Sequence, residues 1–178
     1  MNTSELECIL ERAFRGHGCK FLGVYAADCA PAQLPSYPCA YVVNTDPASA
    51  PGQHWVAFCF ALRGLEFFDS YGNAPATYPH IRIPANVNLV HSNVRLQSPK
   101  SMVCGQYCIY YLINRMLRKR SRFNVLQSLS RLRTRTMHYP QDLHVRRFVR
   151  SLVAQLELVR CCTALHRCGS GQCCRSLC

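Results

Sequence analysis

The spacing of hydrophobic residues divides the chain into helical and extended segments. Near the start, apolar residues recur at helical spacing around a capping-box pair, Ser4 and Glu7, and predict an amphipathic helix that ends near Gly16. The same spacing predicts three later helices, over residues 103–116, 124–132 and 143–158. The last of these has an apolar inner side and an arginine-rich outer side.

Apolar runs rich in β-branched and aromatic residues predict strands between these helices. They cover residues 21–25, 39–44, 54–62, 65–69 and 87–90. Arg63 and Gly64 separate the third run from the fourth, which predicts a hairpin. Because His54 begins one arm and Asp69 ends the other, the hairpin brings both side chains to the same end. A chain of 178 residues suits a single domain with its own core.

The basic residues are concentrated in the second part of the chain. Residues 1–100 hold seven basic and seven acidic side chains, whereas residues 101–178 hold fourteen basic and two acidic ones. The whole formal charge of +12 therefore comes from the second part. Such a field favours polyanions, nucleic acid first, over the alternative of an arginine-rich solubilising face. The candidate contacts are Arg115, Arg118, Lys119, Arg120, Arg122, Arg131, Arg133, Arg135, Arg146 and Arg147.

The thirteen cysteines fall into two groups. Seven lie between Cys8 and Cys108, mostly in apolar surroundings where a thiol acts as a small hydrophobe. The first residues are polar and acidic rather than a secretory signal, so we expect a protein that is not secreted and has no disulfide framework. The longest apolar run, 55–62, is too short to cross a bilayer, so no membrane association is expected.

The other six cysteines crowd into residues 161–178. Their spacing fits no familiar zinc knuckle, so we predict no metal site and favour a disordered extension over zinc binding. The predicted organisation is a domain over residues 1–160 followed by a cysteine-rich, disordered tail over residues 161–178.

Four residues have, in chain order, the chemistry of a thiol-protease site: His54, Asp69, Gln97 and Cys104. Cys104 begins a predicted helix, where the helix dipole and free amides stabilise a thiolate. His54 can take the thiol proton, and Asp69 can accept the imidazole N–H and so orient the ring. Gln97 can donate an amide N–H to a developing oxyanion, beside the backbone N–H of Cys104.

Each of these residues also has an ordinary structural explanation when it is taken alone. Cys104 could be a buried thiol at a helix start, and Asp69 a carboxylate at the end of a strand. Trp55 either covers the face of the imidazole or is a plain core residue. Cys108, one helical turn after Cys104, is best explained as a core thiol. The ordered combination, rather than any single residue, predicts catalysis.

The same motifs carry a resemblance to a known family. Segments in the predicted strands resemble the adenovirus endopeptidase (adenain) family, and Gln97-Ser98-Pro99 followed by Val103-Cys104-Gly105-Gln106-Tyr107-Cys108 resembles its glutamine and nucleophile motif. The block is more similar still to adenain-like proteases of Polinton/Maverick elements and adenovirus-like viruses. The resemblance covers about residues 5–158.

The resemblance implies an α+β fold with a papain-like core, in which helices flank a central mixed sheet and His precedes Cys. It implies a cysteine endopeptidase with Cys104 as nucleophile, His54 as general base, Asp69 orienting the base and Gln97 in the oxyanion hole. It also implies a monomeric enzyme that cleaves capsid or core precursors in the host nucleus and the virion, often after Gly-Gly or Gly-x-Gly sequences. DNA is the implied activating cofactor.

Two departures from the family pattern affect these expectations. Adenovirus enzymes usually have Glu where this chain has Asp69, and Asp occurs in the related proteases of ubiquitin-like proteins. Deconjugation of such modifiers is therefore an alternative, as is, from a different class, an inactive basic DNA-binding packaging protein. No cysteine lies between Cys59 and Cys104, so a disulfide-linked peptide activator at that place is not expected. Dependence on another peptide activator stays open.

Overall fold

The computed structural model describes residues 1–61, 64–134 and 139–168, with the side chains of the last helix described through residue 157. Within these ranges the strands form one sheet in the order β1-β2-β3-β4-β5. The central strands β2, β3 and β4 are antiparallel, whereas β1 and β5 run parallel to their neighbours. The strands are β1 (Lys20–Tyr25), β2 (Cys39–Asn44), β3 (Trp55–Ala61), β4 (Gly64–Phe68) and β5 (Leu89–His91).

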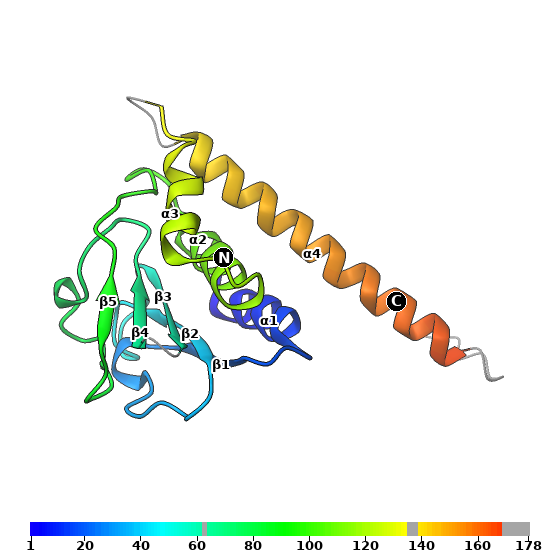
Figure 1. The fold of residues 1–178 in the computed structure, drawn as a ribbon, viewed down its shortest axis with the longest axis horizontal. Helices are drawn as coiled ribbons and strands as arrows, with labels where there is room; N and C mark the ends of the chain where they lie inside the picture. Colours follow the sequence, from blue (N-terminus) through cyan, green and yellow to red (C-terminus); the bar gives the residue numbers. More distant parts are fainter. Residues whose placement is uncertain (62–63, 135–138, 169–178) are drawn as a thin grey trace.

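The helices gather on one side of this sheet (Figure 1). Helices α1 and α2 pack on strands β1 and β3, and α4 packs across their outer side. The helices are α1 (Thr3–Phe14), α2 (Cys104–Leu112), α3 (Arg122–Ser130) and α4 (Tyr139–Cys168), with the short helical turns η1 (Ala27–Cys29), η2 (Pro75–Thr77) and η3 (Ile113–Leu117). The predicted α+β class, with a mixed sheet flanked by helices, is confirmed.

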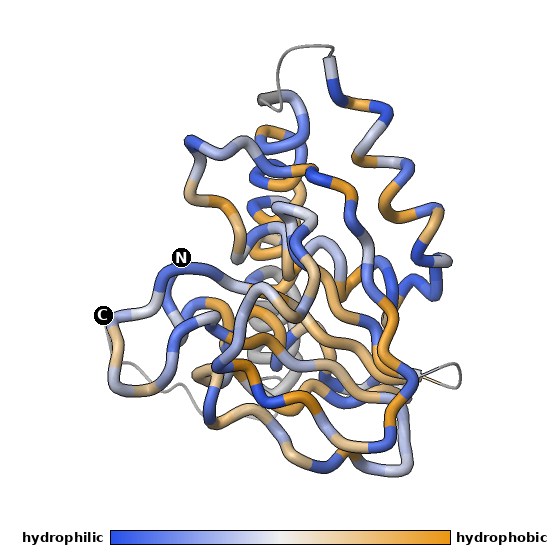
Figure 2. Tube along the Cα trace, turned by 90° about the vertical axis from the view of Figure 1, so that its left-hand side faces the viewer, coloured by the Kyte–Doolittle hydropathy of each residue, from blue (hydrophilic) through white to orange (hydrophobic). Residues whose placement is uncertain are grey.

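Alternate residues of the sheet supply two hydrophobic clusters, one on each face. In β2, Ala40 and Val42 pack towards the helices, whereas Tyr41 and Val43 pack on the opposite face under the long connections. Figure 2 shows hydrophobic stretches running along the strands and hydrophilic ones gathering in the connections. Because both faces of β2 are buried, this strand reads as continuously apolar in the sequence.

The start of α1 differs from the prediction. The capping box is formed by Asn2 and Glu5, not by Ser4 and Glu7. The Asn2 side chain accepts the Glu5 N–H at 2.9 Å, and the Glu5 carboxylate accepts the Asn2 N–H at 3.0 Å. Both pairs have the required spacing of three residues, so spacing alone could not choose between them.

The later helices also have different limits from those predicted. Ser121 caps α3 by accepting the Asn124 N–H, so this helix begins at Arg122. Helix α4 begins at Tyr139, and Pro140 fits its first turn because a residue there needs no N–H partner within the helix. It continues to Cys168 and so enters the segment 161–178 for which disorder is predicted. Residues 169–178 and Arg63 of the predicted hairpin turn lie outside the described residues, whereas Gly64 of that turn begins β4. The boundary at 160 stays a prediction.

Candidate active site

The hairpin of β3 and β4 brings His54 and Asp69 together, as the sequence predicts. The antiparallel register pairs Ala57 with Phe68, so the residues just before β3 and just after β4 meet at one end. His54 Nε2 lies 2.7 Å from Asp69 Oδ1. Both side chains are almost fully buried, which shields their hydrogen bond from water.

The carboxylate of Asp69 is held by four hydrogen bonds. His54 and the N–H of Tyr71 (2.9 Å) donate to Oδ1, and the N–H of Asn73 (3.0 Å) and the hydroxyl of Tyr78 (2.8 Å) donate to Oδ2. Burial raises the pKa of Asp69, but the hydrogen bond and charge of His54, with the other donors, bring it below the ordinary value. The carboxylate is therefore ionised and fixed in orientation at neutral pH.

Cys104 is the first residue of α2 and lines the same cleft as the His54 imidazole. Asp69 engages Nε2 of His54, so Nδ1 is the ring nitrogen left for the thiol. Burial raises the pKa of Cys104, but the hydrogen bond and charge of His54, with the amides of Trp55 and Gly105, lower it below the ordinary value. Burial lowers the pKa of His54, whereas Asp69 and Cys104 together raise it to about 9. These opposite shifts favour a thiolate–imidazolium pair.

A cleft of about 320 Å³ opens onto this pair. Its walls come from the chain start, the 51–53 turn, the start of β3 and the start of α2. They include Asn2, Asn44, Gln53, His54, Trp55, Tyr71, Ser101 and Cys104. Cys104 itself is partly exposed, so a polypeptide carbonyl has access to its sulfur. Cys108, predicted to be a core thiol, is buried, and burial raises its pKa well above the ordinary value.

Gln97 lies close to the cleft but behind its wall. Its side chain is fully buried and is not among the residues that line the cleft. Its Nε2 donates to the carbonyl of Ser101 at 2.7 Å and to the hydroxyl of Tyr71 at 3.2 Å, and its Oε1 accepts from Ser70 Oγ at 2.7 Å. The amide expected in the oxyanion hole is thus already hydrogen-bonded in the free protein.

Tyr71 is the site residue that the sequence did not reveal. Its ring stacks on His54, with centroids 4.7 Å apart and planes at 30°. The aromatic cover of the imidazole considered for Trp55 is therefore supplied by Tyr71, while Trp55 packs against the helical core and lines the cleft. The position of Tyr71 two residues after Asp69 is the one local signal that could have identified it.

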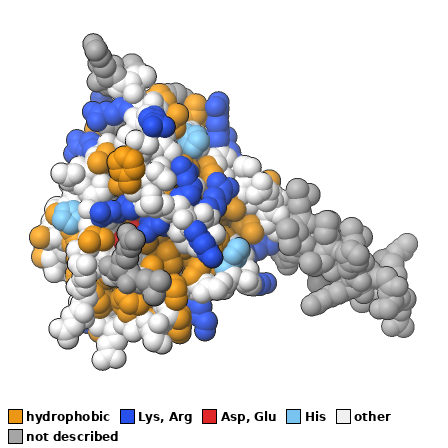
Figure 3. All heavy atoms as spheres, in the orientation of Figure 1, with side chains coloured by type: hydrophobic (Ala, Val, Ile, Leu, Met, Phe, Trp, Pro, Cys, Tyr) orange, Lys and Arg blue, Asp and Glu red, His pale blue; other side chains and the backbone are white. Residues whose placement is uncertain are grey.

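The basic residues predicted to contact DNA do not all have free side chains. Arg115 is nearly buried and forms an ion pair with Glu66, so it is removed from the candidate surface. Arg120 and Arg122 are partly exposed and donate hydrogen bonds to Asn114 and to the His91 carbonyl. Figure 3 shows Lys and Arg spread over one face with little Asp or Glu. Exposed side chains remain at Arg118, Lys119, Arg131, Arg133, Arg146 and Arg147, and Arg135 lies outside the described residues.

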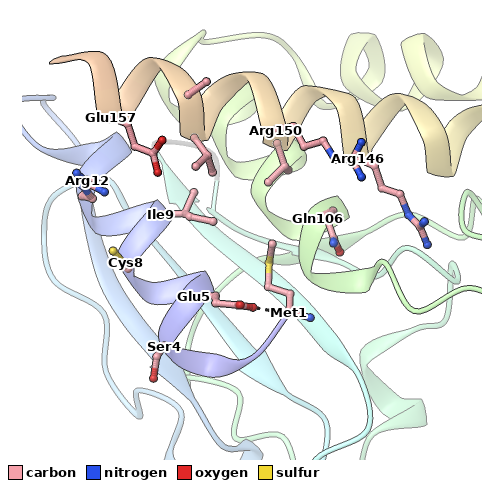
Figure 4. A pocket seen from close by; sticks show the side chains of 13 residues that line it. Met1, Ser4, Glu5, Cys8, Ile9, Arg12, Gln106, Arg146, Arg150 and Glu157 are labelled. Carbon is pink, nitrogen blue, oxygen red and sulfur yellow. Dashed lines mark ion pairs between the residues drawn. The ribbon is translucent and has the colours of Figure 1, made fainter. Parts of the chain in front are cut away.

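A second, larger groove of about 860 Å³ lies between α1 and α4. Figure 4 shows Ile9, Arg12 and Gln106 around it, with Arg150 and Glu157 of α4 on the opposite wall. Its lining includes one thiol but no histidine, and therefore no nucleophile–base pair. Another groove, of about 640 Å³, has both Cys19 and His17 in its lining, but burial raises the pKa of Cys19. The cleft at Cys104 is the candidate active site because it combines a thiol of lowered pKa with an imidazole that is hydrogen-bonded to a carboxylate.

Two other kinds of site are absent from the part of the chain that the structure describes. No group of three or more His, Cys, Asp or Glu side chains there could hold a metal ion. No described helix combines the length and the apolar character needed to span a membrane. The described cysteines, from Cys8 to Cys108, are all free thiols.

Comparison with known proteins gives a partial match to viral cysteine proteases. The chain is 34% identical over 91 residues to the cysteine protease S273R of African swine fever virus, isolate Tick/Malawi/Lil 20-1/1983, which covers 42% of this chain and 33% of that protein. The SUMO-1 cysteine protease S273R of isolate Tick/South Africa/Pretoriuskop Pr4/1996 matches with the same identity and coverage. The chain thus spans about a third of the length of these relatives.

A crystal structure of the African swine fever virus pS273R protease aligns with a TM-score of 0.40 and 26% identity, over 61% of this chain and 43% of that one. No model of a protein family matches the chain. The sequence match shows distant homology to a viral cysteine protease, and the narrower resemblance to adenain stays a prediction.

Proposed function

We propose that this chain is a viral or virus-derived cysteine endopeptidase. One observation carries the proposal: a partly exposed thiol at a helix start contacts an imidazole that a fully hydrogen-bonded carboxylate holds in place. Cys104 and His54 line a cleft that can admit a peptide, and the Asp69 side chain is fully buried against His54. The distant homology to a protein named a cysteine protease agrees with it.

The reaction follows from the positions of these groups. The Cys104 thiolate attacks the scissile carbonyl carbon, and the carbonyl oxygen becomes an oxyanion beside the backbone N–H of Cys104. The His54 imidazolium then protonates the leaving amine, which leaves a thioester. Neutral His54 next takes a proton from water as its oxygen attacks the thioester, which releases the carboxylic acid product and restores the Cys104 thiolate and the His54 imidazolium. Asp69 keeps the ring in one orientation throughout.

The proposed substrates are capsid and core precursors, cleaved in the host nucleus and the assembling virion by a monomeric enzyme. Deconjugation of a ubiquitin-like modifier is the second candidate, because Asp69 replaces Glu and one matched relative is named a SUMO-1 cysteine protease. The two candidate functions are distinguished by comparing the cleavage rates of a modifier with a Gly-Gly tail and of a precursor peptide with the same Gly-Gly sequence. Faster cleavage of the intact modifier would favour deconjugation.

We also propose that DNA stimulates the enzyme. The support is the set of exposed basic side chains on α4 and on the turns before and after α3, which excludes the nearly buried Arg115. A cationic surface concentrates the enzyme on a packaged genome, where precursor proteins are also concentrated.

The decisive test of the protease assignment uses Cys104→Ala and His54→Ala. Each variant should abolish cleavage of a precursor-derived peptide while circular dichroism and thermal unfolding show a folded protein. The matched control is Cys108→Ala, which removes a buried thiol one helical turn further on and should retain a kcat within about tenfold of wild type. Cleavage by Cys104→Ala at the wild-type rate would remove the assignment. A wild-type protein that cleaves nothing but binds DNA would instead favour the packaging alternative.

A further inference from the structure

Tyr71 connects the catalytic pair to the buried glutamine. Its backbone N–H donates to Asp69, its ring stacks on His54, and the residue lines the cleft that contains Cys104. Its hydroxyl lies 3.2 Å from Gln97 Nε2 and 3.4 Å from the Ser101 carbonyl oxygen. The Tyr71 side chain is therefore held at its backbone, at its ring and at its hydroxyl, and its ring lies against the His54 imidazole.

The hydrogen bonds of Gln97 leave its amide no free N–H. A carboxamide has two N–H hydrogens, and those of Gln97 point to the Ser101 carbonyl and the Tyr71 hydroxyl. The amide cannot be turned over, because Nε2 faces a carbonyl oxygen and Oε1 accepts the hydroxyl of Ser70. Since the side chain is also fully buried, an oxyanion in the cleft would meet Tyr71 before it met Gln97.

The hydroxyl of Tyr71, by contrast, holds its hydrogen in a weak contact. Its distance of 3.4 Å to the Ser101 carbonyl is well beyond the roughly 2.7–2.8 Å usual for an O–H···O bond. The oxygen already accepts from Gln97, which polarises the O–H and strengthens it as a donor. Exchanging this long contact for a charged oxyanion would strengthen the hydrogen bond.

We propose that the Tyr71 hydroxyl is the side-chain donor of the oxyanion hole, and that Gln97 acts behind it as a positioning residue. The inference rests on the proposed protease function and refines the oxyanion role of Gln97. Two donors then face the tetrahedral intermediate, the backbone N–H of Cys104 and the O–H of Tyr71. No proton leaves the phenol, because burial and the neighbouring charges of Cys104 and Asp69 raise the pKa of Tyr71 above its ordinary value.

The test compares Tyr71→Phe with Tyr110→Phe. Tyr71→Phe retains the ring on His54 and removes only the hydroxyl, and it should lower kcat about 100-fold with KM within about threefold of wild type. Tyr110→Phe removes a hydroxyl that contacts Ser128 on the side of α2 that faces α3 and α4, and should leave kcat within about threefold. Equal kcat values for Tyr71→Phe and wild type would overturn the proposal.

Alkylation of Cys104 by iodoacetamide separates the donor role from a structural one. Alkylation requires the thiolate but forms no oxyanion, so its rate in Tyr71→Phe should stay within about twofold of wild type. A peptide aldehyde, whose thiohemiacetal carries the oxyanion, should bind Tyr71→Phe about 100-fold more weakly. An alkylation rate that falls in parallel with kcat would contradict the proposal, because the hydroxyl would then act through the His54–Cys104 pair.

A double-mutant cycle shows whether Gln97 acts through Tyr71 or whether the two side chains are independent donors to the oxyanion. Gln97→Ala should lower kcat in the wild-type background but change it by less than about threefold in the Tyr71→Phe background. If the losses of kcat from the two substitutions multiply, Gln97 contacts the oxyanion by itself, and its proposed role behind Tyr71 is wrong. If Gln97→Ala does not fold, Tyr71→Phe decides alone. Absence of Cys104-dependent cleavage in wild type would instead refute the protease function.

Discussion

Strand β4 and the residue that follows it supply two carboxylates, one nearly buried and one fully buried, that have opposite uses. Glu66 lies within the strand and pairs with Arg115, whose Nε donates to it at 2.7 Å. Asp69 follows the end of the same strand and pairs with His54. A guanidinium remains charged at every accessible pH, whereas an imidazole gains and loses its proton near neutrality. The first pair can only hold the fold, while the second can also transfer a proton.

The thiols beside these pairs differ in the same way. Cys59 contacts Glu66 and is completely buried, and burial, followed by the charge of that carboxylate, raises its pKa well above the ordinary value. Cys104 contacts His54 at the cleft, and its pKa is lowered. A thiol in this protein therefore becomes reactive through an adjacent imidazole and a helix start, whereas burial beside a carboxylate keeps a thiol inert.

The largest effect on catalysis is expected from Asp69→Asn. The amide would replace one carboxylate oxygen by a donor that faces the donors now bound to Asp69, and it would remove the charge that orients and protonates His54. We expect kcat to fall on the order of 1,000-fold while the protein stays folded. Steady-state kinetics and thermal unfolding test this.

Glu66→Gln is the matched substitution on the same strand. It removes the charge paired with Arg115 but lies away from the cleft, so kcat should stay within about threefold of wild type. If Glu66→Gln lowered kcat as much as Asp69→Asn, the two carboxylates would not have separate functions and the comparison would fail.

The largest effect on stability is expected from Arg115→Ala. This change leaves the carboxylate of Glu66 buried without its cation, which costs about 3–5 kcal/mol in the free energy of unfolding. Arg147→Ala, at an exposed position of α4, should change that free energy by less than about 0.5 kcal/mol. Urea unfolding measures both free energies. Similar losses in the two variants would mean that the ion pair of Arg115 contributes no more to stability than an exposed arginine does.

The same arginine pair gives the smallest predicted effect, on DNA binding. Arg147→Ala should weaken duplex binding by a few-fold and lower the slope of log affinity against log salt by about 1. Any folded Arg115 variant, such as Arg115→Lys, should leave the slope unchanged, because this side chain already pairs with Glu66. Fluorescence anisotropy at several salt concentrations provides the measurement, and no binding at low salt would refute the DNA proposal.

The parts of the site that the sequence predicts depend on local rules. The register of one hairpin places His54 beside Asp69, and a helix start places Cys104 where a thiolate is stabilised. The strand over 39–44 was predictable because a buried strand reads as an apolar run. In each case the residues that matter are near in sequence or belong to one element.

The parts that the sequence could not predict depend on distant contacts. Arg115 looked like a free cation until folding paired it with Glu66, 49 positions away. The hydroxyl of Tyr71 meets Gln97 across 26 positions, and no periodicity encodes that contact. Helix α1 offered two capping pairs with equal spacing, and only the folded chain selects Asn2 with Glu5.

The most direct measurement compares the alkylation rates of Cys104, Cys8 and Cys29 by mass spectrometry between pH 5 and 10. Cys8 and Cys29 are exposed, so they report ordinary accessible thiols in the same molecule. Cys104 should react fastest at neutral pH, because its lowered pKa yields thiolate there and His54 stays protonated up to about pH 9. This advantage should disappear in His54→Ala. A rate for Cys104 no greater than those of Cys8 and Cys29, rising only near pH 8.5 as for a free thiol, would contradict the account.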